Sequence, residues 1–281
     1  MADIAAKDVA QLRKLTGAGM MDCKKALVET SGDIEAAKDW LRKKGLAGAA
    51  KREGRAADQG AIEVVVEGGV AAVVELNCET DFVAKGAEFK DFVGALANQV
   101  ARDGDADLAG QAYDGSTVGE TITQMGSRLG ERIELGRIAR YESADGILDG
   151  YKHIQNDRGT IGVLVELAGV SPDDANAQSV AHDIALHIAS AAPRFVSKDD
   201  VPADAIEKER EVLTELTRNE GKPDDVIEKI VTGRLNGFYK DYCLLEQGFV
   251  KEPKTTIAKL VDGLGSGATV KRFVRIKVGE D

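Results

Sequence analysis

The sequence predicts an α+β fold in three parts: an N-terminal three-helix bundle, a duplicated core of strands and helices, and a helical hairpin inserted in the second copy. Three observations support this prediction. Apolar residues recur at helical spacing in the first 45 residues, and the order strand, strand, helix, helix, strand then occurs twice. Two long helix-like segments interrupt the second occurrence.

The composition indicates a cytoplasmic protein without a membrane span. A chain of 281 residues has room for two domains, or for one with appendages. It has no run of about 18 apolar residues, and Met1–Lys7 lacks the charged and apolar segments of a secretory signal. The three cysteines, Cys23, Cys78 and Cys243, form no C-x-x-C, so neither a disulfide framework nor a zinc site is predicted.

The charge is unevenly distributed. The net charge of −11 disfavours direct binding to nucleic acid, which needs clustered Lys and Arg. Residues 1–55 carry 12 Lys and Arg against 8 Asp and Glu, a net charge of +4, and the remainder carries 25 against 40, a net charge of −15. Basic clusters such as 42–44 fit solvated helix ends or an electrostatic docking surface, and the sequence leaves both open.

Residues 1–45 are predicted to form the bundle. Helices are expected over 4–16, from about Met21 to Glu29, and from an N-cap cluster at 31–33 to Gly45. Of the adjacent Met20 and Met21, which cannot both face one helical core, we expect one to pack inside and the other to contact a partner. Residues 46–58 are small and polar without a clear apolar face, which predicts a linker, helical or not.

Residues 59–143 are predicted to form the first core subdomain. Strands at 61–67 and 70–76 flank Gly68-Gly69, a strong hairpin signal. An amphipathic helix follows at 88–100, then a polar loop at 103–115, a helix at 118–129 and a strand at 133–141.

The second core subdomain is predicted over 144–200 and 244–281. Its apolar strand 163–167 matches 72–76 at an offset of 91 (167 minus 76), and its last helix and strand match 122–140 at an offset of 135 (272 minus 137). The difference between the offsets locates an insertion at 201–243, where helix-like segments 201–219 and 224–243 flank a turn. We expect an antiparallel helical hairpin there.

The stretch Asn77–Val83 follows the second predicted strand. It places an acidic and an aromatic side chain, Asp81 and Phe82, on the connection to the next helix. Thr80 or Asp81 could simply cap the next helix while Phe82 and Val83 staple it. Alternatively, the pair is presented to a partner. The second copy has an ordinary turn, 168–174, at this point, so the strand-to-helix passage does not need these residues, which favours recognition.

Motifs for bond-making chemistry are missing from the sequence. It has no phosphate-binding Gly-x-x-x-x-Gly-Lys-Ser/Thr, no Gly-x-Gly-x-x-Gly after a strand and no Gly-x-Ser-x-Gly. His182 and His187 fall on different sides of a helix, and His153 sits beside a strand start. We therefore expect no enzyme, cofactor or metal site. A scaffold or adaptor that buries Asp81 and Phe82 in its own core remains the competing hypothesis.

Two long motifs resemble the elongation factor Ts family of bacterial translation factors. Leu-Arg-x-x-Thr-Gly-Ala-Gly-Met-Met-Asp-Cys-Lys-Lys-Ala-Leu at 12–27 resembles the family's N-terminal signature, and 77–84 resembles its second signature. Residues 159–167 with the insertion resemble its second core subdomain. The resemblance implies a ubiquitin-associated-like bundle, a two-subdomain core and a protruding hairpin. Some members continue into a helical C-terminal module, whose contacts are not expected of this chain.

The resemblance also implies a function. Family members are guanine-nucleotide exchange factors for elongation factor Tu, which they bind in its GDP-bound and nucleotide-free forms. Thr80, Asp81, Phe82 and Val83 match the positions associated with displacing Mg²⁺ from that partner. Leu12, Met20 and Met21 match further contacts, and His153 matches a core histidine only weakly because 155–158 changes the spacing. Self-association through the core or the hairpin is left open.

Overall fold

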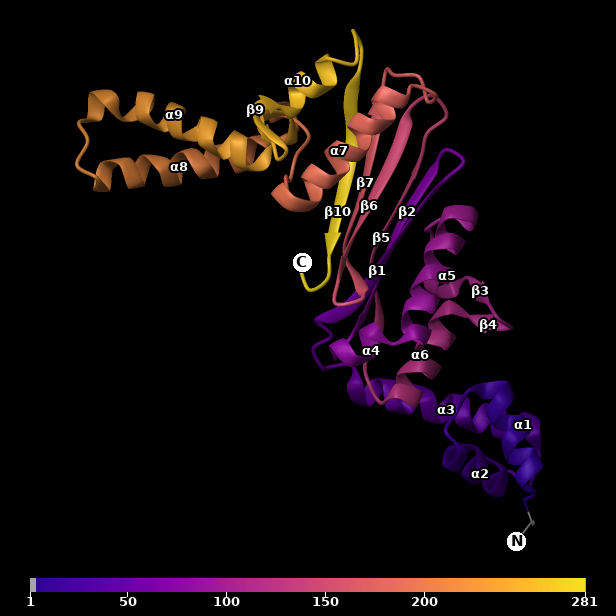
Figure 1. The fold of residues 1–281 in the computed structure, drawn as a ribbon. Helices are drawn as coiled ribbons and strands as arrows, with labels where there is room; N and C mark the ends of the chain where they lie inside the picture. Colours follow the sequence, from indigo (N-terminus) through magenta and orange to yellow (C-terminus); the bar gives the residue numbers. More distant parts are fainter. Residues whose placement is uncertain (1–3, 281) are drawn as a thin grey trace.

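The computed structural model describes residues 4–280, so the first three residues of the segment inspected for a signal lie outside the described part. The molecule consists of a small helical bundle at one end, a core of two sheets flanked by helices, and a long helical hairpin that projects from the core (Figure 1). The α+β prediction is confirmed. No helix within residues 4–280 is both long and apolar enough to cross a membrane.

The bundle consists of α1 (Ala6–Thr16), α2 (Met20–Glu29) and α3 (Ile34–Arg52). Gly17, in the left-handed conformation, ends α1, and the Asp33 side chain caps α3. The expected end of the third helix at Gly45 is wrong, because α3 continues to Arg52 through half of the predicted linker. Gly45 is buried against α6, where a Cβ atom would lie 3.7 Å from the Ser127 Oγ, so tertiary packing carries the helix past the glycine.

The first core unit is a three-stranded antiparallel sheet, in the order β1-β2-β5, covered on one face by helices. Its strands are β1 (Gln59–Glu67), β2 (Val70–Cys78) and β5 (Ile133–Glu142), and its helices are α4 (Asp81–Lys85), α5 (Ala87–Asp103) and α6 (Val118–Leu129). The predicted polar loop contains ordered structure instead: the 3₁₀ helix η1 (Leu108–Gly110), and β3 (Ala112–Tyr113), which pairs with β4 (Ser116–Thr117). Leu108 is buried in the same core, which explains why this segment adopts regular structure.

The second core unit repeats the first. Its sheet, in the order β10-β7-β6, consists of β6 (Ile147–Gln155), β7 (Arg158–Ala168) and β10 (Thr269–Lys277). It is covered by α7 (Ala175–Ala191) and α10 (Ile257–Asp262), and η2 (Lys198–Asp200), η3 (Leu244–Glu246), β8 (Gly248–Phe249) and β9 (Glu252–Thr256) complete it. The buried Glu75 accepts a hydrogen bond from Arg137, and Glu166 accepts one from Arg272, at the predicted offsets of 91 and 135.

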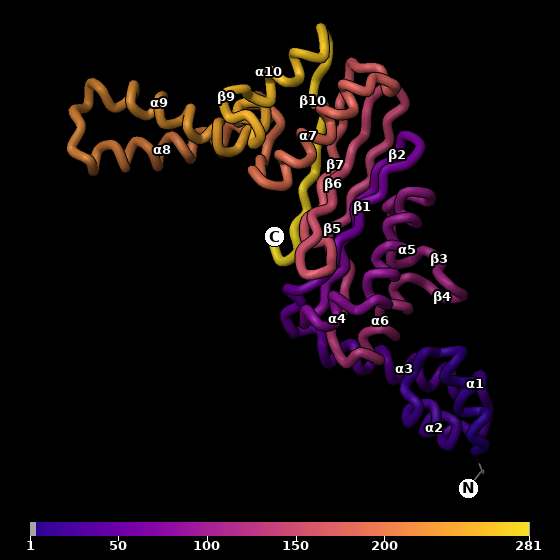
Figure 2. Tube along the Cα trace, in the orientation of Figure 1, coloured from indigo at the N-terminus to yellow at the C-terminus, as the bar shows by residue number. Residues whose placement is uncertain are grey.

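The two sheets pack face to face between the helices, so the core has four layers (Figures 1 and 2). Along β2, Ala72 and Val74 face the helices while Ala71 and Val73 face the second sheet. Burial on both faces explains the uninterrupted apolar run of this strand. Gly162 permits the close approach, because a Cβ atom there would lie 2.6 Å from the methyl groups of Ile62 and Val73.

The insertion is the predicted antiparallel hairpin of α8 (Ala203–Asn219) and α9 (Asp224–Tyr242), which projects from the second core unit (Figure 2). Backbone hydrogen bonds fix its base: the amides of Arg194 and Phe195 both donate to the Tyr242 carbonyl, at 2.9 and 3.1 Å, and Leu244 donates to Phe195.

Candidate functional site

The stretch Asn77–Val83 forms the end of β2 and the start of the short helix α4. Thr80 is the N-cap, and its Oγ1 accepts a hydrogen bond from the Val83 amide at 3.4 Å. Val83 and the buried Ala84 pack on the first core. Phe82 does not staple the helix, because its side chain is 84% exposed. The turn therefore combines a structural cap with an aromatic side chain presented to solvent.

Asp81 lies beside Phe82 on the same turn. Its Oδ2 is 2.5 Å from the Lys85 Nζ, and 43% of the side chain is exposed. The hydrogen bond from Lys85 holds the pKa of Asp81 below its usual range. Asp81 and Phe82 thus place a carboxylate, paired with Lys85, and an exposed apolar ring on a single turn of helix.

Two glutamates brace the chain just before α4. Glu131, after α6, accepts hydrogen bonds from the Glu79 amide at 3.1 Å and the Thr80 amide at 3.0 Å, and its Oε1 accepts the Thr80 hydroxyl at 2.5 Å. In return, Glu79 accepts the Arg132 amide at 2.6 Å, and this bond is the main cause of its lowered pKa. Burial, with the nearby Glu131 charge, raises the pKa of the Cys78 thiol to about 12.

The second core unit also contacts this turn. Asn156 and Asp157, both at positive φ, form the tight β6–β7 turn, and Lys90 of α5 lies 2.6 Å from the Asp157 carboxylate. The buried Arg158 donates to the Gln59 Oε1 at 2.7 Å and to the Asp81 carbonyl at 3.5 Å. The turn that presents Phe82 is thus held by parts of both copies.

Sequence reasoning missed these supporting residues. Glu131 follows the helix-ending Gly130, and its counterpart in the second copy, after Gly265, is Ser266 (131 plus 135). That difference was the available signal. The role of Arg158 had no comparable signal, because its contacts depend on how the two sheets pack.

His153 lies near the end of β6, not beside the start of a strand as expected. Its side chain is exposed, and its Nδ1 is 3.2 Å from the Tyr151 hydroxyl. The next residue, Ile154, is also exposed. Both residues belong to the same β6–β7 hairpin that supplies Arg158.

The N-terminal bundle presents both methionines. Met20 and Met21 are 59% and 73% exposed, so the expectation that one of them packs inside is wrong. Both methionines lie in the first turn of α2, and the buried residues of this helix are Cys23, Ala26 and Leu27. The methionines border a groove of about 660 Å³ that Arg13, Lys14 and Lys24 also line. Leu12 is fully buried, so its side chain shapes the bundle and offers no surface.

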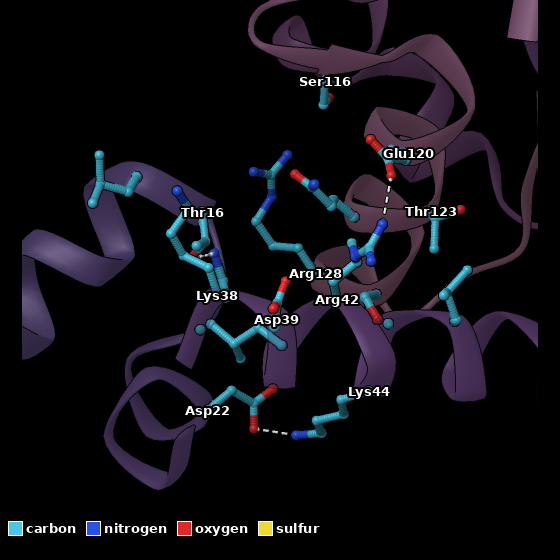
Figure 3. A pocket seen from close by; sticks show the side chains of 18 of the residues that line it. Thr16, Asp22, Lys38, Asp39, Arg42, Lys44, Ser116, Glu120, Thr123 and Arg128 are labelled. Carbon is cyan, nitrogen blue, oxygen red and sulfur yellow. Dashed lines mark hydrogen bonds and ion pairs between the residues drawn. The ribbon is translucent and has the colours of Figure 1, made fainter. Parts of the chain in front are cut away.

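A cleft of about 570 Å³ is lined by residues of the bundle and of α6 (Figure 3). Across it, Arg42 of α3 and Glu120 of α6 lie 3.2 Å apart, and Lys44 pairs with Asp22 inside the bundle (Figure 3). A Cβ atom on Gly17 would lie 2.7 Å from the Arg128 guanidinium, so the bundle rests directly against the core. These contacts place the methionine groove relative to the core.

The two remaining histidines face different environments. His182 is exposed, with its Nδ1 3.1 Å from the Asp149 carboxylate. His187 is buried, between the Gln247 Oε1 at 2.9 Å and the Val250 amide at 3.3 Å, and burial lowers its pKa. Within residues 4–280, no cluster of three or more His, Cys, Asp or Glu side chains could hold a metal ion.

Comparison with known proteins identifies the family of this chain. A family model described as "Elongation factor TS" matches residues 79–280. Elongation factor Ts of Streptomyces avermitilis is 48% identical over 287 residues, covering 99% of this chain and 100% of the relative. Those of Thermobifida fusca and Symbiobacterium thermophilum are 47% and 45% identical, each covering 100% of this chain and respectively 100% and 93% of the relative. The resemblance seen in the two motifs is confirmed: the chain belongs to the elongation factor Ts family of translation elongation factors.

Proposed function

We propose that this protein is the guanine-nucleotide exchange factor of elongation factor Tu. It binds the GDP-bound form, displaces Mg²⁺ and promotes release of GDP, so that GTP can bind, and it makes or breaks no covalent bond. The observation that carries the proposal is the 84% exposure of Phe82 on a turn that is braced from several sides. Such an exchange would take place in the cytoplasm, without a cofactor of its own.

Exchange follows from linkage. A factor that binds the empty GTPase more tightly than the nucleotide-bound form must weaken nucleotide binding by the same ratio. Mg²⁺ requires near-ideal octahedral geometry, so a small shift of the partner's helices loosens the ion and the phosphates that it bridges. In this scheme Phe82 enters a pocket that exists only in the shifted partner, Asp81 acts beside it, and Thr80 and Val83 hold the turn.

Further contacts would spread the binding energy over the molecule. Met20 and Met21 offer adaptable apolar surface, and the neighbouring Arg13, Lys14 and Lys24 fit the electrostatic docking role that the charge pattern left open. His153 offers a weaker contact beside the site, and Leu12 contributes through the shape of the bundle. We divide the molecule into three units, the bundle, the duplicated core and the hairpin at 201–243, and the contacts named here lie in the first two.

The adaptor hypothesis required Asp81 and Phe82 to be buried in their own chain. Phe82 is the most exposed of the large apolar side chains in the described residues, which argues against that hypothesis. Self-association through the core or the hairpin stays a prediction, which sedimentation equilibrium of the free protein would test.

Release of a fluorescent GDP analogue from elongation factor Tu, with Mg²⁺ present, tests the proposal. We expect strong stimulation by the intact protein and little by the double variant Asp81→Ala/Phe82→Ala, because the double variant retains its folded core but lacks the presented pair. If neither protein stimulates release while both are folded, the exchange function is refuted.

A further inference from the structure

We propose that Glu131 is the positioning residue of the exchange site: by accepting three hydrogen bonds from Glu79 and Thr80, it holds α4 in the conformation in which Phe82 is presented. This inference rests on the proposed exchange function. It gives Glu131 a role in the free protein, before any partner is bound.

The short helix α4 needs such support. It has five residues, fewer than an isolated helix needs to be stable in water. Its most apolar side chain, Phe82, faces solvent and contributes no packing to the fold. Val83 and Ala84 anchor one side of the helix on the core, which leaves the direction of its first turn to polar contacts.

Glu131 supplies those contacts at the point where the chain leaves β2. One carboxylate oxygen accepts two successive backbone amides, and the other accepts the Thr80 hydroxyl. The same Thr80 oxygen accepts the Val83 amide, so the bond to Glu131 orients the cap itself. Hydrogen bonds to an ionised carboxylate are stronger than those between neutral groups.

The brace is reciprocal. The Glu79 carboxylate accepts the amide of Arg132, the residue after Glu131, at 2.6 Å, and also lies 3.2 Å from the Arg55 guanidinium. Each of the two connections therefore holds the backbone of the other. This arrangement ties the start of α4 to the junction between α6 and β5.

The second copy shows that the fold does not need this brace. At the offsets of 91 and 135, Val170 stands in place of Glu79 and Ser266 in place of Glu131. The second copy passes from strand to helix with Asp174 as the N-cap of α7. The paired carboxylates occur only in the copy that presents an aromatic side chain, which assigns them to that presentation.

The effect of losing the brace should appear at a particular step. Without Glu131, α4 must be ordered when Phe82 enters the partner, whereas the first encounter through the bundle is unaffected. We expect Glu131→Ala to lower the maximal rate of stimulated GDP release about 10- to 100-fold, the range expected for the loss of one charge-assisted hydrogen bond. The concentration giving half-maximal stimulation should change about threefold or less.

A double-mutant cycle with Phe82→Ala separates positioning from other roles. If Glu131 acts through Phe82, Glu131→Ala should cost little in the Phe82→Ala background, and Glu131→Gln, whose carbonyl can still accept the two amides, should restore most of the rate. Glu252→Ala, an exposed glutamate on β9, is the matched control and should leave the rate unchanged.

Alkylation of Cys78, followed by peptide mapping, gives a readout that does not need the partner. Cys78 and Cys243 are both buried. The Glu131 charge itself raises the pKa of Cys78, so Glu131→Gln, which also lacks the charge, is the reference. Local opening in Glu131→Ala should accelerate modification of Cys78, but not of Cys243, relative to Glu131→Gln, whereas a general loss of stability would accelerate both.

The outcomes distinguish this inference from the proposed function. Normal release with Glu131→Ala, in an assay where Phe82→Ala is defective, overturns the positioning role and leaves the exchange function standing. An equal loss in the wild-type and Phe82→Ala backgrounds also overturns it. If wild-type protein stimulates no release, the exchange function fails, and unequal cysteine modification would show only that Glu131 orders α4.

Discussion

Replacing Phe82 by alanine should separate function from stability. The side chain is 84% exposed in the free protein, so its removal uncovers almost no buried surface. Exposed substitutions of this kind change the free energy of unfolding by about 0.5 kcal/mol or less. Burying a Phe side chain in a partner contributes about 1.5–3 kcal/mol, and about 1.4 kcal/mol corresponds to a factor of ten. Phe82→Ala should therefore slow stimulated GDP release about 10- to 100-fold.

The assay is stopped-flow release of a fluorescent GDP analogue at saturating exchange factor, together with thermal unfolding of the free variant. Val212→Ala is a matched control, because Val212 is another exposed apolar residue but lies on α8 of the hairpin. Unchanged release with Phe82→Ala would refute the insertion of the ring. A loss of release accompanied by a fall in Tm of several degrees would instead assign the residue to the fold.

Five further substitutions test the bundle, the core and the pH dependence of stability. Leu12→Ala should destabilise the bundle by about 2–5 kcal/mol, because Leu12 is fully buried, whereas Met21→Ala should leave the Tm unchanged and weaken binding of elongation factor Tu in a titration. Gly162→Ala should destabilise the core by about 1–3 kcal/mol in urea unfolding, because its Cβ would lie 2.6 Å from Ile62, and Gly94→Ala, with open space at the Cβ, should not. Burial lowers the pKa of His187 in the folded protein. As the pH falls, the imidazole is therefore protonated in the unfolded chain before it is protonated in the folded one. The free energy of unfolding should therefore fall as the pH drops below about 6.5, and His187→Gln should show a smaller fall.

The fold could be predicted from the sequence where local pattern and tertiary packing agree. Phe89, Phe92 and Leu96 recur at helical spacing and are all buried on one face of α5. Gly68 and Gly69, both at positive φ, form the turn between β1 and β2. The offset of 91 between the copies was visible because equivalent strands must bury equivalent side chains, as the paired Glu75 and Glu166 do.

Prediction failed where distant contacts decide. Glycine commonly ends a helix, yet α3 continues past Gly45 because α6 packs over that residue. The offset of 135 holds for the last strands but not for the starts of α6 and α10, whose N-caps Thr117 and Thr256 differ by 139 (256 minus 117). The helix α10 is shorter than α6, and an offset measured near the end of the helix does not show where the helix begins.

The candidate site divides in the same way. Asp81 and Phe82 could be found from the sequence because a charged and an aromatic residue on a connection have no use within the strand, and because the second copy lacks them. Whether they were buried or presented could not be decided without the structure, since an N-cap with a hydrophobic staple has a similar composition. The structure confirms the cap at Thr80 and leaves Phe82 exposed, as recognition by a partner would require.

The duplication explains how such a site can exist without weakening the fold. An exposed aromatic ring on a five-residue helix contributes nothing to stability, and the braced carboxylate pair next to it has to be kept ordered. In the second copy the same passage is made by a glycine at positive φ and an aspartate cap, Gly169 and Asp174, with no exposed ring. The second sheet then packs on the first and lends Arg158 to the Asp81 carbonyl. One copy thus retains the ordinary connection and helps to hold the other, whose connection carries the exposed ring that we propose is presented to a partner.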